Sequence, residues 1–79
     1  MSEEVLYRSP LMYRVLREGS GALVIEVVVG GMAMSAVRVR LHATEADAYA
    51  KEGSHFSDRL AREIMANPRF GGRAYDAPD

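Results

Sequence analysis

Residues 22–41 read ALVIEVVV-GG-MAMSAVRVRL, so two runs of strand-forming residues are separated by Gly30 and Gly31. Valine and isoleucine favour strands, and glycine adopts the positive φ angles that tight hairpin turns require. The pattern therefore predicts a β-hairpin of residues 22–29 and 32–42 with the glycine pair at its turn. The rest of the chain has to be arranged around this hairpin.

Alternation along the two strands predicts which side chains share a face. A two-residue turn would place the apolar face of the first strand beside the arginines of the second, because a shift of one residue exchanges the faces of a strand. Burial favours a shifted register, in which Ile25 pairs with Val37 and Leu23 pairs with Val39. This register requires a three-residue loop with a glycine bulge, or a bulge near residues 35–36. A sheet covered on both faces, for example in a dimer, is the alternative.

One further strand, residues 11–17, is predicted before the hairpin, because Pro10 suits a strand start and residues 18–21 have the composition of a turn. We expect an antiparallel meander of three strands in the order 1-2-3. Thr44 is expected to cap a short helix that ends at Gly53, and Ser54 is expected to cap the next helix.

The second predicted helix is amphipathic. Phe56, Leu60 and Ile64 recur every four residues from position 55, with Ala61 and Met65 beside them. This helix should end at residues 67–68, because a residue before proline avoids the helical region. We expect both helices to pack on one face of the sheet, which gives an α+β fold.

Length and composition predict one small globular domain. The chain has 79 residues, of which 48% are hydrophobic and 27% are charged. We expect residues 1–68 to form the domain and the glycine-rich residues 69–79 to form a flexible C-terminal tail. With no cysteine, the chain cannot use disulfides or cysteine-based zinc sites. Small chains without such devices favour association with a second copy or with a protein partner.

The N-terminal and apolar segments indicate a location. Residues 1–4, MSEE, lack the basic and apolar segments of a secretory signal. The longest apolar stretch, residues 22–36, is interrupted by Glu26 and by the glycine pair, and is too short to span a bilayer. We therefore expect a cytoplasmic protein that does not engage a membrane.

Two surfaces could bind a partner. Met12, Met32 and Met34 are candidates for an adaptable apolar contact surface near the hairpin tip, and filling the end of the core is the alternative role. The predicted edge strand, residues 11–17, could accept another strand. Self-association or binding of a protein partner is the function that these surfaces favour.

The alternative function is nucleic-acid binding through arginines on one sheet face. The candidate residues are Arg14, Arg38, Arg40 and His42, which could contact phosphates. The net charge of −1 and the absence of aromatic residues from that face favour a solvated surface. Residues 69–73, RFGGR, are a single copy of an arginine-glycine motif found repeated in RNA-binding tails, and one copy favours a flexible terminus over RNA binding.

No residue pattern indicates catalysis or a cofactor. His42, Glu45 and Asp47 match no established metal-ligand spacing. Residues 54–58, SHFSD, contain a serine, a histidine and an aspartate, but adjacent residues on a helix point in different directions and do not form a triad by themselves. We expect a non-enzymatic interaction module without cofactor or metal.

Overall fold

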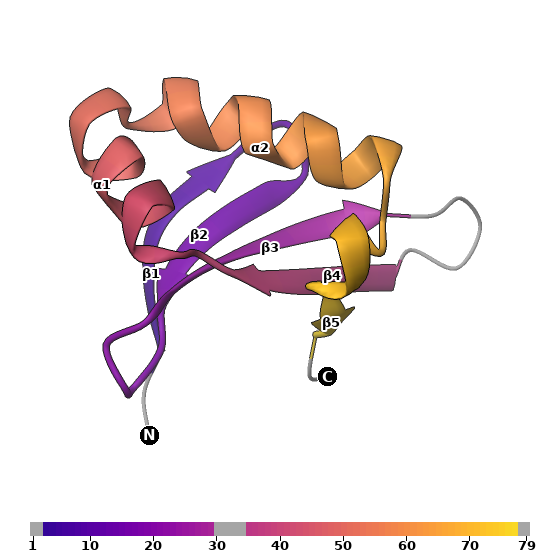
Figure 1. The fold of residues 1–79 in the computed structure, drawn as a ribbon, viewed down its shortest axis with the longest axis horizontal. Coiled ribbons are helices and arrows are strands. Elements are labelled where there is room, and N and C mark those ends of the chain that lie inside the picture. Colours follow the sequence, from indigo (N-terminus) through magenta and orange to yellow (C-terminus); the bar gives the residue numbers. More distant parts are fainter. Residues whose placement is uncertain (1–2, 30–34, 78–79) are drawn as a thin grey trace.

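The computed structural model describes residues 3–29 and 35–77. In this part of the chain, the strands form one antiparallel five-stranded sheet in the order β1-β2-β3-β4-β5. Both helices lie over the same face of the sheet (Figure 1). The α+β class is thus confirmed. The elements are β1 (Glu4–Ser9), β2 (Tyr13–Arg17), β3 (Leu23–Val29), β4 (Ser35–Arg40), α1 (Ala43–Glu52), α2 (Ser54–Ala66), the 3-10 turn η1 (Phe70–Gly72) and β5 (Tyr75–Asp76).

The prediction of a three-stranded meander is wrong in strand number. β1 precedes the predicted first strand and β5 follows the helices. The predicted strand at residues 11–17 is β2, which begins at Tyr13 and lies between β1 and β3, so it is not an edge. Pro10 lies in the turn between β1 and β2, where the Ser9 hydroxyl accepts a hydrogen bond from the backbone N–H of Leu11 at 3.0 Å.

The predicted faces of the central hairpin are confirmed, but the predicted pairing partners are wrong. Ile25 pairs with Val39 and Val27 with Val37, two positions away from the predicted register. A shift of two residues changes the partners and preserves the faces. The pairing is regular through residues 35–36, so the bulge predicted there does not form. The predicted glycine turn lies outside the described residues.

The two predicted helix N-caps are both wrong. His42, not Thr44, is the N-cap of α1, and its backbone N–H donates to Oε1 of Glu45 at 2.6 Å. Gly53, at φ 62°, ends α1 and directly precedes α2, so Ser54 is the first residue of α2 and not its cap. The C-cap of α2 is Asn67, as the following proline led us to expect.

The core lies between the sheet and α2. The predicted apolar face of α2 is buried there, whereas Met65, which we placed beside it, is 38% exposed. Leu16 and Val24, which alternation assigns to the opposite face of the sheet, are also fully buried. The core residues are Tyr13, Val15, Ile25, Val27, Val39, Phe56, Leu60, Ala61 and Ile64.

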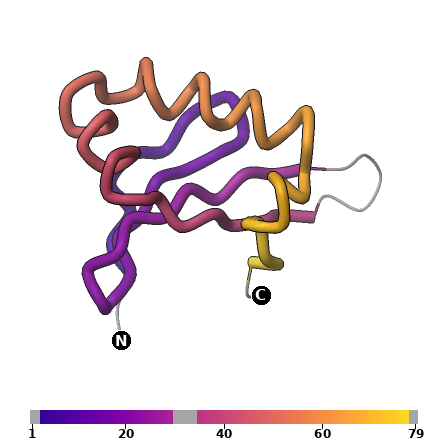
Figure 2. Tube along the Cα trace, viewed as in Figure 1, coloured from indigo at the N-terminus to yellow at the C-terminus, as the bar shows by residue number. Residues whose placement is uncertain are grey.

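The segment that follows α2 returns to the sheet (Figure 2). Tyr75 and Asp76 pair with Arg38 and Val37 of β4. Arg73 donates to the carboxylate of Glu45 at 2.7 and 3.0 Å and to the carbonyl oxygen of Arg40 at 2.8 Å. Part of the segment that we predicted as a flexible tail therefore completes the sheet, and its flexibility stays a prediction.

Within residues 3–29 and 35–77, neither α1 nor α2 combines the length and the apolar character that a membrane-crossing helix needs.

Candidate binding site on the open face of the sheet

The face of the sheet opposite the helices, here called the open face, carries one row of side chains that crosses all five strands. Arg8 pairs with Arg14, Arg14 with Glu26, Glu26 with Arg38, and Arg38 with Tyr75. We call these five residues the cross-strand row. Side chains that lie directly opposite each other on neighbouring strands interact, so four neighbouring charged side chains lead across the sheet to the neutral Tyr75.

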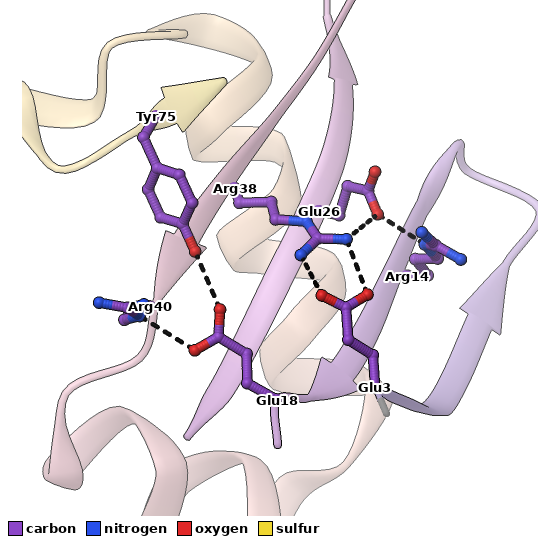
Figure 3. Close-up of polar contacts among 7 residues, drawn as sticks. All are labelled: Glu3, Arg14, Glu18, Glu26, Arg38, Arg40 and Tyr75. Atoms are coloured by element: carbon purple, nitrogen blue, oxygen red, sulfur yellow. Dashed lines mark hydrogen bonds and ion pairs between the residues drawn. The ribbon is translucent and has the colours of Figure 1, made fainter. Parts of the chain in front are cut away.

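Arg38 is the most buried charged residue of this row. It is 4% exposed, and its two terminal nitrogens donate to the two carboxylate oxygens of Glu3 at 2.6 and 3.1 Å (Figure 3). The hydrogen bond from Arg38 lowers the pKa of Glu3, and the same contact raises the pKa of Arg38. A buried charge has to be paired, and the bidentate carboxylate satisfies this requirement.

Glu26 links Arg38 to the next arginine of the row. Its Oε1 lies 3.5 Å from a terminal nitrogen of Arg38 and 2.6 Å from Nε of Arg14. The Glu26 side chain is 13% exposed, whereas that of Arg14 is 31% exposed. Glu3 and Glu26 together therefore neutralise Arg14 and Arg38.

A second ionic cluster lies beside the cross-strand row. Nε of Arg40 donates to Glu18 at 3.1 Å, and the Tyr75 hydroxyl donates to the same carboxylate at 3.4 Å (Figure 3). The Arg40 guanidinium also lies over the Tyr75 ring, 5.8 Å from its centre. Burial is the main cause that raises the pKa of Tyr75, and the Glu18 carboxylate adds to it.

The structure brings three of the four predicted nucleic-acid residues to the open face. Arg14, Arg38 and Arg40 lie there, whereas His42 lies beyond β4 as the N-cap of α1. The sequence reasoning missed their partners Glu3, Glu18 and Glu26. A signal existed for Glu26, the single acid within the apolar strand of residues 22–29. Glu3 and Glu18 lie outside the strands, where alternation carries no information.

A hollow of about 290 Å³ opens at the β1 end of the cross-strand row. Arg8 is exposed, and its side chain takes part in no hydrogen bond or ion pair with another described residue. Met12 is 48% exposed and has a φ of 71°. The hollow thus combines cationic and apolar walls. Its lining residues are Arg8, Ser9, Met12, Tyr13, Arg14, Glu26 and Val28.

The predicted partner-binding methionines are placed only in part. Met12 lies in the turn between β1 and β2, next to Leu11, which is 42% exposed. Met32 and Met34 lie outside the described residues, so their contribution stays a prediction.

Residues that we weighed for catalysis or metal binding and set aside make structural contacts. The Tyr13 hydroxyl bonds to the Ser57 hydroxyl at 2.7 Å and to the carboxylate of Asp58, which ties β2 to α2. Burial and the Asp58 contact raise the pKa of Tyr13 to about 12. Glu45 is held by Arg73, which lowers the Glu45 pKa. Residues 3–29 and 35–77 contain no cluster of three or more metal-ligating side chains.

Comparison of the chain with protein-family models, with curated proteins and with solved structures finds no match.

Proposed function

We propose that this protein is a non-enzymatic interaction module that associates through the β1–β2 hairpin. The observation that carries the proposal is the conformation of Met12, which is half exposed at a φ of 71°. The left-handed region costs a residue with a side chain about 1 kcal/mol, and glycine or asparagine is the usual occupant. A strained and exposed apolar residue is explained when its side chain has a binding role.

The outer edge of β1, next to the turn that holds Met12, also favours the β1–β2 hairpin as the contact surface. On the outer side of β4, β5 pairs with Val37 and Arg38, and the Ala77 N–H donates to the Ala36 carbonyl at 3.1 Å. The outer side of β1 has no strand neighbour among the described residues. Free edges accept strands from other chains. A bulge interrupts β1 between Val5 and Tyr7, so we place the contact at residues 7–12.

Nucleic-acid binding is the second candidate, and the charge pairing supports it less. Arg38 is nearly buried and Arg40 is paired with Glu18, so phosphates would have to displace carboxylates. Phosphate contacts weaken steeply with salt. An oligonucleotide that binds at ~50 mM salt, and binds less well to the Arg40→Ala variant, would favour this candidate over protein association.

The proposed association is tested with a second copy of this chain, because that version needs no other component. Sedimentation velocity from about 5 to about 500 µM protein covers the range of weak self-association. We expect a sedimentation coefficient that rises with concentration. The Met12→Asn variant removes the apolar side chain and keeps the left-handed turn, so it should stay monomeric without loss of thermal stability.

Met65→Gln is the matched control, because Met65 is 38% exposed on α2, far along the chain from the hairpin. We expect it to associate like the unmodified protein. A monomer at every concentration, or equal weakening by Met12→Asn and Met65→Gln, would overturn self-association through the hairpin.

A further inference from the structure

We propose that the hollow at the β1 end of the cross-strand row binds a monocarboxylate. Arg8 and Arg14 would receive the carboxylate group, and Met12 and Val28 would contact a short apolar stem. The proposal goes beyond protein association, because both arginines belong to one chain and the site needs no second copy.

The cross-strand row has more positive than negative side chains near the hollow. Among the described residues, Arg8, Arg14 and Arg38 face two carboxylates, Glu3 and Glu26. Both carboxylates are bound to Arg14 or Arg38, so one positive charge is left at Arg8. The three arginines and two carboxylates therefore have a formal charge of +1, and the unpaired Arg8 borders the hollow.

The two arginines of the proposed site are placed so that both can reach one anion. Arg8 and Arg14 lie directly opposite each other on β1 and β2. Like charges in such a pair destabilise a sheet, and an anion between them would remove the repulsion. Arg14 uses its Nε for Glu26, and its two terminal nitrogens bond to no other described residue. A guanidinium with free terminal donors suits the planar geometry of a carboxylate.

The charge, volume and apolar lining of the hollow favour a monocarboxylate over a phosphate. Glu26 also lines the hollow, so a dianion would leave an excess of negative charge where a monoanion neutralises the row. The volume of about 290 Å³ is at the lower end of small-molecule sites. Met12 and Val28 offer apolar contact that inorganic phosphate cannot use.

The experiment is an NMR titration of backbone amides with hexanoate, with hexanamide as the uncharged match and with inorganic phosphate. An N-acetylated tripeptide that ends in leucine, and its C-terminal amide, distinguish a chain end from a free acid as the source of the carboxylate. We expect hexanoate or the free-acid peptide to shift the amides of Met12 and Val28, and whichever binds more tightly identifies the source. Hexanamide and the C-terminal amide of the tripeptide should each bind at least about tenfold more weakly than the corresponding acid.

Arg8→Gln should weaken carboxylate binding about tenfold or more, because a charge-assisted hydrogen bond is lost. Arg62→Gln, an exposed arginine on α2, is the matched control and should leave binding unchanged. Tighter binding of phosphate, equal binding of acids and amides, no binding below about 10 mM, or an unchanged Arg8→Gln variant would overturn the proposal. Titration at a concentration where the protein sediments as a monomer separates this result from the outcome of the association test.

Discussion

The helix-covered face and the open face of the sheet are built from alternate residues of the same strands, yet the open face buries a charged side chain in addition to apolar ones. On the helix-covered face, Val27 and Val39 are fully buried against other apolar residues. Their sequence neighbours Glu26 and Arg38 point to the open face, where Arg38 is almost as buried as the valines. Alternation assigns the faces, but the burial of an arginine also requires carboxylates that other segments supply.

The two kinds of burial differ in how specific a partner each contact requires. The apolar core needs only volume and approximate shape, so many residues contribute to it without a specific partner. The ionic row depends on named partners, and Glu3 reaches Arg38 across 35 positions of the sequence. Three measurements of protein stability test this difference between the two faces.

The largest change in the free energy of unfolding is expected when a valine on each face is truncated to alanine. Val27→Ala should lower the free energy of unfolding by about 3 kcal/mol, because it removes fully buried methyl groups and leaves a cavity. Val28→Ala, on the open face and only half-buried, should cost about 1 kcal/mol. Urea denaturation measures both values. Equal losses would mean that the two faces are packed alike.

On the helix-covered face, the polar contact of the Tyr13 hydroxyl with Ser57 and Asp58 should make the stability depend on pH. The unfolded chain loses the tyrosine proton near pH 10, whereas folded Tyr13 holds it up to about 12. The protonated Tyr13 hydroxyl therefore contributes fully to stability below pH 10. This contribution is lost as the pH rises from 10 to 12, at a cost of about 2.7 kcal/mol, or about 1.36 kcal/mol for each pKa unit. Denaturation at several alkaline pH values measures it.

Tyr13→Phe should reduce this alkaline loss of stability, although it lowers the stability at neutral pH because Ser57 and Asp58 lose their partner. Tyr7→Phe, at the ring that packs beside Tyr13, is the control and should keep the loss. The same alkaline slope in Tyr13→Phe and in the unmodified protein would show that another group causes it.

The smallest effect is expected in the ionic row. Glu26→Gln removes the charge shared by Arg14 and Arg38 and should cost about 1.5 kcal/mol, since Glu3 still holds Arg38. Glu4→Gln breaks the exposed pair with Arg17 and should cost close to nothing. Thermal unfolding at low and high salt compares the two. A Glu26→Gln variant as stable as Glu4→Gln would show that the row is not a stabilising network.

Strong local patterns made part of this fold predictable. The helix over residues 54–66 follows from three apolar residues spaced by four, and its end follows from Pro68. Alternation placed Ile25 and Val39 on one buried face although their exact pairing was predicted wrongly. Periodicity identifies a face, whereas the pairing partner depends on how many residues join the strands.

The missed strands lacked such patterns. β1 contains a bulge between Val5 and Tyr7, which breaks the alternation that would have indicated a strand. β5 has two residues, and it forms against a β4 edge whose position no local signal predicts. The sequence therefore predicted the arginines of the candidate site but not their partners, because the arginines lie in strands and two of the carboxylates do not.

Local sequence alone settled the α+β class, the central hairpin, the amphipathic second helix and the sharing of one face by Arg38 and Arg40. These features depend on backbone preferences and on the periods of helices and strands, which act over a few residues. Tertiary structure decided that β1 and β5 complete the sheet, that Glu3, Glu18 and Glu26 neutralise the arginines, and that Arg8 borders a hollow beside Met12. Those outcomes depend on contacts between distant segments, which form only when burial of the core brings them together.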